Sequence, residues 1–280
     1  MRTAQAAVPS ITLHDGIEIP QLGIGVFGVP PRETQRAVEL ALEAGYRHID
    51  TATTHGNEKE VGAALAASGL PREDYFVTAQ LWSSQQGHDS TLMAFEASLD
   101  RLGLDHVDLY LTHWPVPAGS PFVDSWQALE RIHGEEAART IGVSNFSVED
   151  LELLERETET RPTINQVELH LHAQRAELRA WHAEHGIATG VRNPLAQGEL
   201  LDEPMIVRLA ERRGKTAAQV ILRWNLQLGN VVIPKSLTPE QTCANIDFFD
   251  FELSHREMAA IGDLDRSRRI GPRRATSLAS

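Results

Sequence analysis

Short apolar runs alternate along the chain with longer amphipathic segments. The apolar runs cover residues 22–26, 48–50, 76–79, 107–111, 140–143, 163–169, 187–191 and 231–234. Short, nearly continuous apolar runs are typical of strands in a parallel sheet that is covered on both faces. Eight of them, each followed by a helix-length segment, predict an α/β fold, a single (β/α)8 TIM barrel.

The segments between the runs carry the periodicity of helices. Residues 32–44 place Ala37, Leu40 and Ala41 on one face and stop before Gly45, as helices commonly do. Similar patterns predict crossover helices over residues 58–67, 91–102, 126–136, 148–156, 176–185, 216–228 and 239–246.

Three features lie outside this repeat. Residues 11–19 alternate apolar and polar positions around Asp15-Gly16, which predicts a β-hairpin at the start of the chain. Residues 205–213 and 254–264 predict extra helices near the carboxyl end. We therefore expect residues 1–280 to form one barrel domain with an N-terminal hairpin and extra C-terminal helices.

Composition narrows the class of protein. The 280 residues include 39 acidic and 26 basic side chains, a balance that disfavours gripping nucleic acid through its phosphates. No apolar run approaches the ~20 residues that cross a bilayer, and the first ten residues carry no secretion signal, so we expect a cytoplasmic protein without a membrane anchor. Cys243 is the single cysteine, which excludes an intrachain disulfide and a cysteine-based metal cluster.

The carboxyl end departs from the acidic balance of the chain. Five arginines fall within residues 266–280: Arg266, Arg268, Arg269, Arg273 and Arg274. One interpretation is a solvated tail. The other is a segment that folds across a binding site and attracts an anionic substrate.

In a barrel of this kind the chemistry sits at the carboxyl ends of the strands. This rule selects Asp50, Gln80, His113 and Gln166, together with residues 191–195. His170 and His172 share a strand face, but two histidines without a third ligand are weak evidence, so no metal site is predicted.

Sequence motifs point to one family. They are GYRHIDTATTHGNE at residues 45–58, VDLYLTHWP at 107–115, IGVSNF at 141–146, NQVELH at 165–170, and IPKS at 233–236 with Asn245. From residue 11 to about 264 the chain resembles the aldo-keto reductases, in particular bacterial diketogluconate reductases. The resemblance implies a TIM barrel and, for typical members, NADP(H)-dependent carbonyl reduction by an Asp, Tyr, Lys and His tetrad.

The chain departs from that tetrad at two places. Asp50 and His113 fill the first and last positions, whereas His55 stands where the family has its proton-donating tyrosine. Gln80 stands in place of the lysine that tunes this tyrosine. Loss of the acid together with its tuning partner indicates a change of chemistry.

The resemblance also implies a partly retained cofactor site. Ser144, Asn145 and Gln166 match residues that hold the nicotinamide carboxamide, and Lys235, Ser236 and Asn245 match part of the adenosine-phosphate grip. However, Arg192 falls where the family stacks an aromatic ring on the nicotinamide, and Gln241 replaces an arginine that binds the 2′-phosphate. A guanidinium there would repel the positive ring of an oxidised nicotinamide, which predicts weak NADP(H) binding.

The remaining residues favour acid–base chemistry. An imidazole has an ordinary pKa near 6.5, so His55 and His113 can exchange protons near pH 7, with Asp50 to orient His55. Gln80 can hold a substrate oxygen or His55 itself. Phe27, Trp82 and Trp114, with Arg192, match positions that line the family's substrate pocket and suggest an apolar or ring-containing substrate.

Three functions remain open at this point. The favoured one is redox-neutral dehydration, isomerisation or cyclisation of a small carbonyl or polyketide-like compound, which requires no cofactor. The second is an atypical carbonyl reductase that uses NADP(H) and takes its proton from His55 or water. The third is a catalytically silent binding protein; in each case we expect a monomer whose partner is a small molecule.

Overall fold

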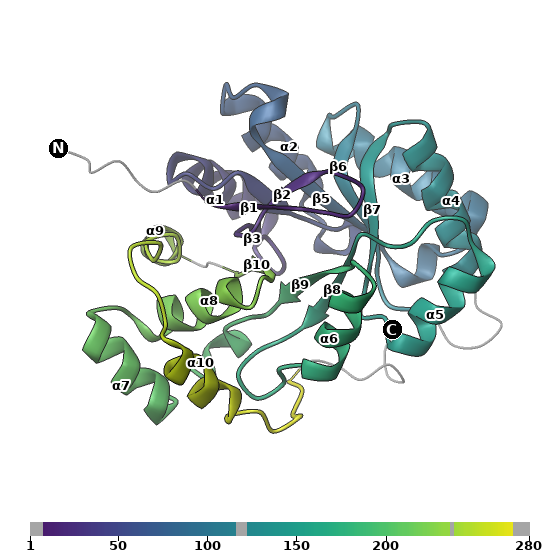
Figure 1. Ribbon diagram of the computed structural model, residues 1–280. Helices are drawn as coiled ribbons and strands as arrows, with labels where there is room; N and C mark the ends of the chain where they lie inside the picture. Colours follow the sequence, from purple (N-terminus) through teal and green to yellow (C-terminus); the bar gives the residue numbers. More distant parts are fainter. Residues whose placement is uncertain (1–7, 116–121, 236–237, 271–280) are drawn as a thin grey trace.

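Eight parallel strands form the centre of the computed structural model, which describes residues 8–115, 122–235 and 238–270. In sheet order they are β3 (Ile24–Gly25), β4 (His48–Asp50), β5 (Phe76–Leu81), β6 (Val107–Thr112), β7 (Ala138–Ser144), β8 (Ile164–Glu168), β9 (Ala188–Arg192) and β10 (Val231–Ile233). Each strand pairs with its neighbours in chain order (Figure 1). The predicted TIM barrel is confirmed.

Backbone hydrogen bonds close the sheet between its first and last strands. Gly23 N–H donates to Val232 O and Gly25 N–H to Pro234 O, both over 3.0 Å. Val232 N–H donates to Gln21 O over 2.7 Å. Gly25 approaches β10 closely, because a Cβ on it would lie 3.1 Å from Ile233 Cγ2.

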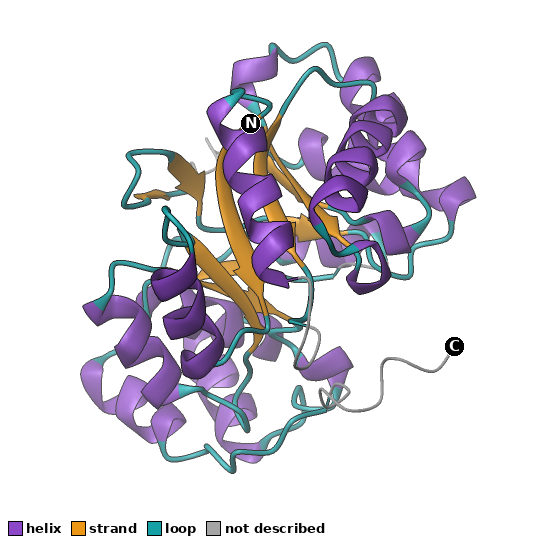
Figure 2. Ribbon diagram, turned by 90° about the vertical axis from the view of Figure 1, so that its right-hand side faces the viewer, coloured by secondary structure: helices purple, strands orange, loops and turns teal. Residues whose placement is uncertain are grey.

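Helices surround the strands on the outside, as Figure 2 shows. The crossover helices are α1 (Pro31–Glu43), α2 (Glu58–Ala67), α3 (His88–Leu102), α4 (Phe122–Gly134), α5 (Val148–Glu157), α6 (Ala176–Glu184), α8 (Ala217–Gln227) and α9 (Pro239–Ala244). The extra helices are α7 (Pro204–Arg213) and α10 (His255–Gly262). Each overlaps the segment that the sequence predicted.

Local signals explain where several helices begin and end. Ser147 caps α5, because its hydroxyl accepts from Asp150 N–H while the Asp150 side chain accepts from Ser147 N–H. Gly45, with a φ of +100°, stops α1. α4 ends at Gly134 rather than at the predicted residue 136, because the chain turns through Glu136 with a φ of +59° before β7.

The predicted hairpin is present as β1 (Ser10–Thr12) and β2 (Glu18–Pro20), which pair antiparallel with Ile11 opposite Ile19. It covers one end of the barrel. Leu13 and Ile19 are buried in an apolar cluster with strand residues that include Phe76, Leu109, Leu111, Ile164, Val231 and Ile233. Because these strands begin at that end, the hairpin plugs the barrel opposite the carboxyl ends, where the chemistry is expected.

The arginine-rich segment folds back onto the barrel as far as it is described. The backbone N–H groups of Arg266 and Arg268 donate to His172 O over 3.2 and 2.8 Å. Residues 265–270 are thus held beside the loop that follows β8, and the remaining ten residues lie outside the described part. Residues 266–268 are exposed to solvent, as the first interpretation expects, but residues 266–270 are not a free tail, because hydrogen bonds from their backbone hold them to the barrel.

Candidate functional site

Three amide and carboxyl groups meet at the carboxyl ends of the strands. Asp50 ends β4, Gln80 lies in β5 and Gln166 in β8, and all three side chains are buried. Gln166 Nε2 donates to Asp50 Oδ2 over 2.7 Å, and Gln80 Nε2 donates to Gln166 Oε1 over 2.9 Å. Gln80 Nε2 also reaches both Asp50 oxygens at 3.4 and 3.5 Å. The three side chains form a closed triangle.

Burial dominates the charge state of Asp50. It raises the pKa of this carboxyl to about 6, although the hydrogen bonds from Gln166 and Gln80 and the charge of Arg192 act in the opposite direction. Asp50 is therefore the group of this site that ionises closest to neutral pH.

His55 lies at the end of η1 (Thr53–His55), directly after β4. Its ring packs edge-on against Phe27, with centroids 5.2 Å apart, and its Nδ1 is buried with no hydrogen-bond partner. Burial lowers the pKa of His55 to about 4, and the charges of Arg192 and Lys235 contribute to the same shift. At pH 7 this imidazole is neutral.

His113 follows β6 and packs against Trp82, with ring centroids 4.6 Å apart. Its Nδ1 lies 3.4 Å from Ser83 Oγ. Burial lowers the pKa of His113 to about 3, and the charges of Arg192 and His55 add to this effect. At pH 7 this imidazole is neutral as well.

Two expectations from the sequence need correction. Asp50 does not orient His55, because its oxygens accept from Gln80 and Gln166, and no hydrogen bond or ion pair joins it to an imidazole in the described residues. Proton exchange near pH 7 was expected of His55 and His113, yet burial and nearby cations keep both neutral. Gln80 holds Gln166 and Asp50 rather than His55.

The groups expected to hold a nicotinamide carboxamide are engaged with one another. Ser144 Oγ donates to Gln166 O over 2.8 Å, and Asn145 Nδ2 donates to Ser144 Oγ over 2.9 Å. Arg192 Nη2 donates to Asn145 Oδ1 over 3.4 Å, and both ends of the Gln166 amide are used by Asp50 and Gln80. A bound carboxamide would have to replace these hydrogen bonds.

The residues matched to the adenosine-phosphate grip are partly described. Lys235 bridges to Gly25 beside β10, and its Nζ lies close to Gly28, 3.1 Å from where a Cβ would stand. Asn245 follows α9 as its C-cap, and Ser236 lies outside the described residues. Lys235 is the side chain of this set that could hold a phosphate.

The expected pocket residues differ in exposure. Phe27 is 64% exposed, Trp82 is half-buried against His113, and Trp114 is only 6% exposed. Arg269 covers Trp114, because its guanidinium lies 5.2 Å from the centre of the ring. Phe27 and Trp82 therefore offer apolar surface to a ligand, whereas Trp114 supports the site from beneath.

Glu168 is an element of the site that the sequence analysis missed. It ends β8, is 1% exposed, and accepts from Ile270 N–H over 2.7 Å and from Arg269 Nε over 3.3 Å. This carboxylate fastens the C-terminal segment to the barrel. Its position at a strand end is the signal that would have found it.

Histidines beside Glu168 form pairs rather than a metal cluster. His170 Nε2 lies 3.3 Å from Glu168 Oε1, and His172 Nε2 lies 3.4 Å from Glu203 Oε2. Across the described ranges, no three His, Cys, Asp or Glu side chains are arranged to hold a metal ion. Over the same ranges no helix is long and apolar enough to span a bilayer.

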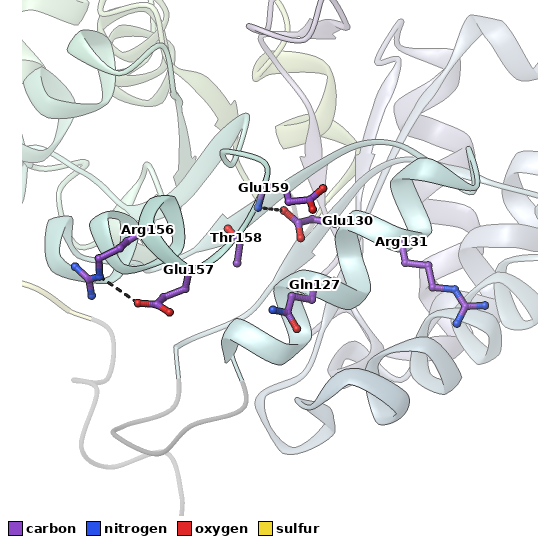
Figure 3. Close-up of a pocket in the computed structure, with 7 residues that line it drawn as sticks. All are labelled: Gln127, Glu130, Arg131, Arg156, Glu157, Thr158 and Glu159. Carbon is purple, nitrogen blue, oxygen red and sulfur yellow. Dashed lines mark hydrogen bonds and ion pairs between the residues drawn. The ribbon is translucent and has the colours of Figure 1, made fainter.

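A surface hollow of about 670 Å³ lies between α4 and α5, far from these side chains (Figure 3). Its lining is polar and internally paired: Glu130 accepts from the N–H groups of Glu159 and Thr160, and Arg156 pairs with Glu157. The hollow lies at the carboxyl ends of both helices, and thus at the amino ends of the strands.

Comparison with known proteins decides the family. The model of the aldo/keto reductase family matches residues 21–266. The chain belongs to this family. A relative from Mycolicibacterium smegmatis named as an aldo-keto reductase is 53% identical over 264 residues, which cover 94% of this chain and 96% of the relative.

Solved aldo-keto reductase structures share the fold. One from Brucella melitensis is 49% identical with a TM-score of 0.89, and covers 92% of this chain and 100% of its own. The Bombyx mori aldo-keto reductase, solved in complex with NADP, is 34% identical with a TM-score of 0.89 over 95% of this chain and 96% of its own. The family resemblance read from the motifs is confirmed.

Proposed function

We propose that this member of the aldo/keto reductase family catalyses redox-neutral acid–base chemistry on a small carbonyl compound. The observation that carries the proposal is the closed triangle of Asp50, Gln80 and Gln166. It engages the amide that would hold a nicotinamide ring and contains neither a tyrosine nor a lysine. Relatives are named as reductases, and the chemistry proposed here is a departure from that name.

Neutral imidazoles suit a proton-transfer reaction. As a neutral, partly exposed imidazole, His55 can accept a proton from the carbon next to the substrate carbonyl. The C–H electron pair then forms the C=C bond of an enolate, whose oxygen an N–H of His113 can stabilise. In a substrate with a β,γ-double bond the enolate is a dienolate, and return of the proton to its γ-carbon completes an isomerisation. In a β-hydroxy substrate the enolate expels the β-hydroxyl, which takes the proton and leaves as water, and this completes a dehydration. Neither route involves net oxidation or reduction.

The proposal is tested with purified protein in D2O and no nicotinamide. A panel of β-hydroxyketones and 1,3-diketones is followed by NMR for deuterium uptake and by mass spectrometry for loss of water. We expect enzyme-dependent exchange or water loss that falls about 10² to 10⁴-fold in His55→Ala and in His113→Ala, the usual contribution of positioned proton transfer. His88→Ala, a change to an exposed histidine on α3, is the matched control.

Full activity in the His55→Ala protein, or turnover that strictly requires NADPH, would contradict the proposal. Absence of any reaction across the panel, with tight binding of the same compounds, would instead favour the silent binding protein. We propose that the protein acts as a monomer on a small-molecule substrate.

A second candidate is an atypical NADP(H)-dependent carbonyl reductase in which His55 or water supplies the proton. Lys235 favours it, because an amine in this position can hold a phosphate, and so does the likeness to an aldo-keto reductase solved with NADP. A fluorescence titration with NADPH separates the two candidates. With Gln241 in place of the family's arginine, one charge-assisted contact to the 2′-phosphate is lost, which weakens NADPH binding about tenfold or more. Micromolar or tighter affinity for NADPH would therefore favour the reductase.

A further inference from the structure

Arg192 ends β9, at the carboxyl ends of the barrel strands. It pairs in register with Glu168 of β8 on one side and with Ile233 of β10 on the other. Hydrogen bonds link it through Asn145 and Ser144 to Gln166, whose amide donates to Asp50. Its charge also lowers the pKa of His55 and of His113. A cation therefore stands among the residues assigned to the chemistry.

The hydrogen-bonding capacity of Arg192 is largely unused. Its Nε is buried with no hydrogen-bond partner, and its hydrogen bond to Asn145 Oδ1 is long, at 3.4 Å. In the parts of the chain that the structure describes, it forms no ion pair with a carboxylate, unlike Arg269, which pairs with Glu168. A buried guanidinium has five N–H donors in a planar fork, and a site that leaves one of them unpaired is unfavourable until an acceptor arrives.

The carboxyl group of Asp50 does not provide an acceptor for Arg192. The oxygens of Asp50 accept from Gln166 and Gln80, and this carboxyl is partly protonated near its pKa of about 6. The other carboxylate that acts on Arg192 is Glu168, and it is already paired with Arg269. A second cation, Lys235, places its Nζ close to Gly28, the residue after Phe27, whose ring packs against His55. Its charge lowers the pKa of this imidazole.

We propose that Arg192 is the anchor of an anion-binding subsite, with Lys235 as a second cation, that holds a carboxylate of the substrate beside His55. Binding of an anion at this subsite does not depend on the proposed function; only the statement that the anion is the substrate rests on it. The planar fork of a guanidinium matches a carboxylate with two parallel hydrogen bonds, and burial strengthens such contacts.

Bound carboxylate would also prepare His55 for proton transfer. The positive charge of Arg192 opposes protonation of His55, and a carboxylate paired with Arg192 offsets that charge. His55 then becomes a stronger base only when an anionic substrate is in place. This coupling links recognition of the anion to the reaction without any movement of the backbone.

Calorimetric titration at low salt tests the subsite without turnover or nicotinamide. Benzoate is the anionic probe, benzamide its uncharged counterpart, and inorganic phosphate a second anion. We expect benzoate to bind more tightly than benzamide to the wild type. Arg192→Gln should weaken benzoate binding about tenfold or more, the equivalent of one charge-assisted hydrogen bond, and leave benzamide unchanged. Arg156→Gln, a change to an exposed arginine on α5, should alter neither.

Arg192→Lys serves as a second variant if the glutamine protein fails to fold. It retains the charge but loses the planar fork, so benzoate affinity should fall several-fold. Equal benzoate affinity in the wild type and either variant would overturn the proposal, as would Arg192-dependent binding of phosphate alone. Arg192-dependent benzoate binding in a protein whose turnover requires NADPH would support the subsite and overturn only the proposed redox-neutral function.

Discussion

The side-chain amide of Gln166 donates a hydrogen bond to Asp50 Oδ2 over 2.7 Å, and this contact joins the ends of β8 and β4 across the barrel. Gln80, from β5 between them along the chain, donates to the same amide over 2.9 Å. Gln166 uses both ends of its carboxamide, since its Nε2 donates to Asp50 and its Oε1 accepts from Gln80. Gln80 acts only as a donor, through Nε2, and closes the triangle by reaching Asp50 as well.

Asp50 should make stability depend on pH. Its pKa is raised from 3.8 to about 6, so the folded protein favours the protonated form. The stabilising contribution is complete below the ordinary pKa and is lost as pH rises through 6; two units correspond to about 3 kcal/mol. We expect the free energy of unfolding of the wild type, relative to Asp50→Asn, to fall by about this amount between roughly pH 3.5 and 7.

Urea denaturation at each pH measures this difference. Asp89→Asn is the control, because that carboxylate is 91% exposed and should leave the pH profile of the wild type intact. Parallel profiles for the wild type and Asp50→Asn would show that Asp50 ionises normally.

Gly190 should be required for the position of Gln166. The two residues are register partners, and a Cβ on Gly190 would lie 3.0 Å from Gln166 Cα and 3.1 Å from its Cγ. We expect Gly190→Ala to destabilise the fold by about 1 to 3 kcal/mol, as overpacking does. Gly134→Ala in α4 meets nothing within 4 Å and should be neutral or slightly stabilising. Thermal unfolding measures the midpoint temperatures of the two variants. Equal changes in midpoint temperature for Gly190→Ala and Gly134→Ala would refute the packing argument.

Restoring the family's acid and its tuning lysine should not by itself restore carbonyl reduction. His55→Tyr with Gln80→Lys leaves Arg192 at the end of β9, the position where the family stacks an aromatic ring on the nicotinamide. A positive charge there would oppose an oxidised nicotinamide. We expect no NADPH-dependent reduction of a simple aldehyde by this double variant. Adding Arg192→Trp should raise the rate about tenfold or more, the effect of one recovered contact.

NADPH consumption at 340 nm provides the measurement. The pair Gln80→Lys and Arg192→Trp, which retains His55, controls for effects of the tryptophan alone. Rates typical of a reductase in the double variant would show that Arg192 leaves the cofactor site usable.

Glu168 should hold the C-terminal segment closed. Glu168→Gln keeps an acceptor for Ile270 N–H but removes the charge that pairs with Arg269. We expect hydrogen exchange at the backbone amides of Arg268 and Ile270 to accelerate about tenfold or more, because local opening becomes easier. Glu157→Gln, which removes an exposed pair with Arg156, is the control and should change neither amide. Unchanged hydrogen exchange at these amides in Glu168→Gln would mean that other contacts hold the C-terminal segment against the barrel.

Much of the fold could be predicted from the sequence, for physical reasons. Buried parallel strands require short apolar runs, and helices that cover them require a 3.6-residue period, so both signals are local. The hairpin around Asp15-Gly16 was equally local, because its turn places Gly16 at a φ of +89°. Boundaries such as the end of α4 depended on the conformation of Glu136, which the apolar pattern does not encode.

The sequence by itself determined the family, the barrel and the identity of the residues at the strand ends. Only the tertiary structure decided how those residues are paired and charged. Asp50 and Gln166 are 116 positions apart, and their hydrogen bond exists because β4 and β8 end on the same face of the barrel. The pKa values of His55 and His113 are lowered by burial and by Arg192, which comes from another strand. A pKa depends on everything around a group in space, and the order of residues along the chain does not specify those surroundings.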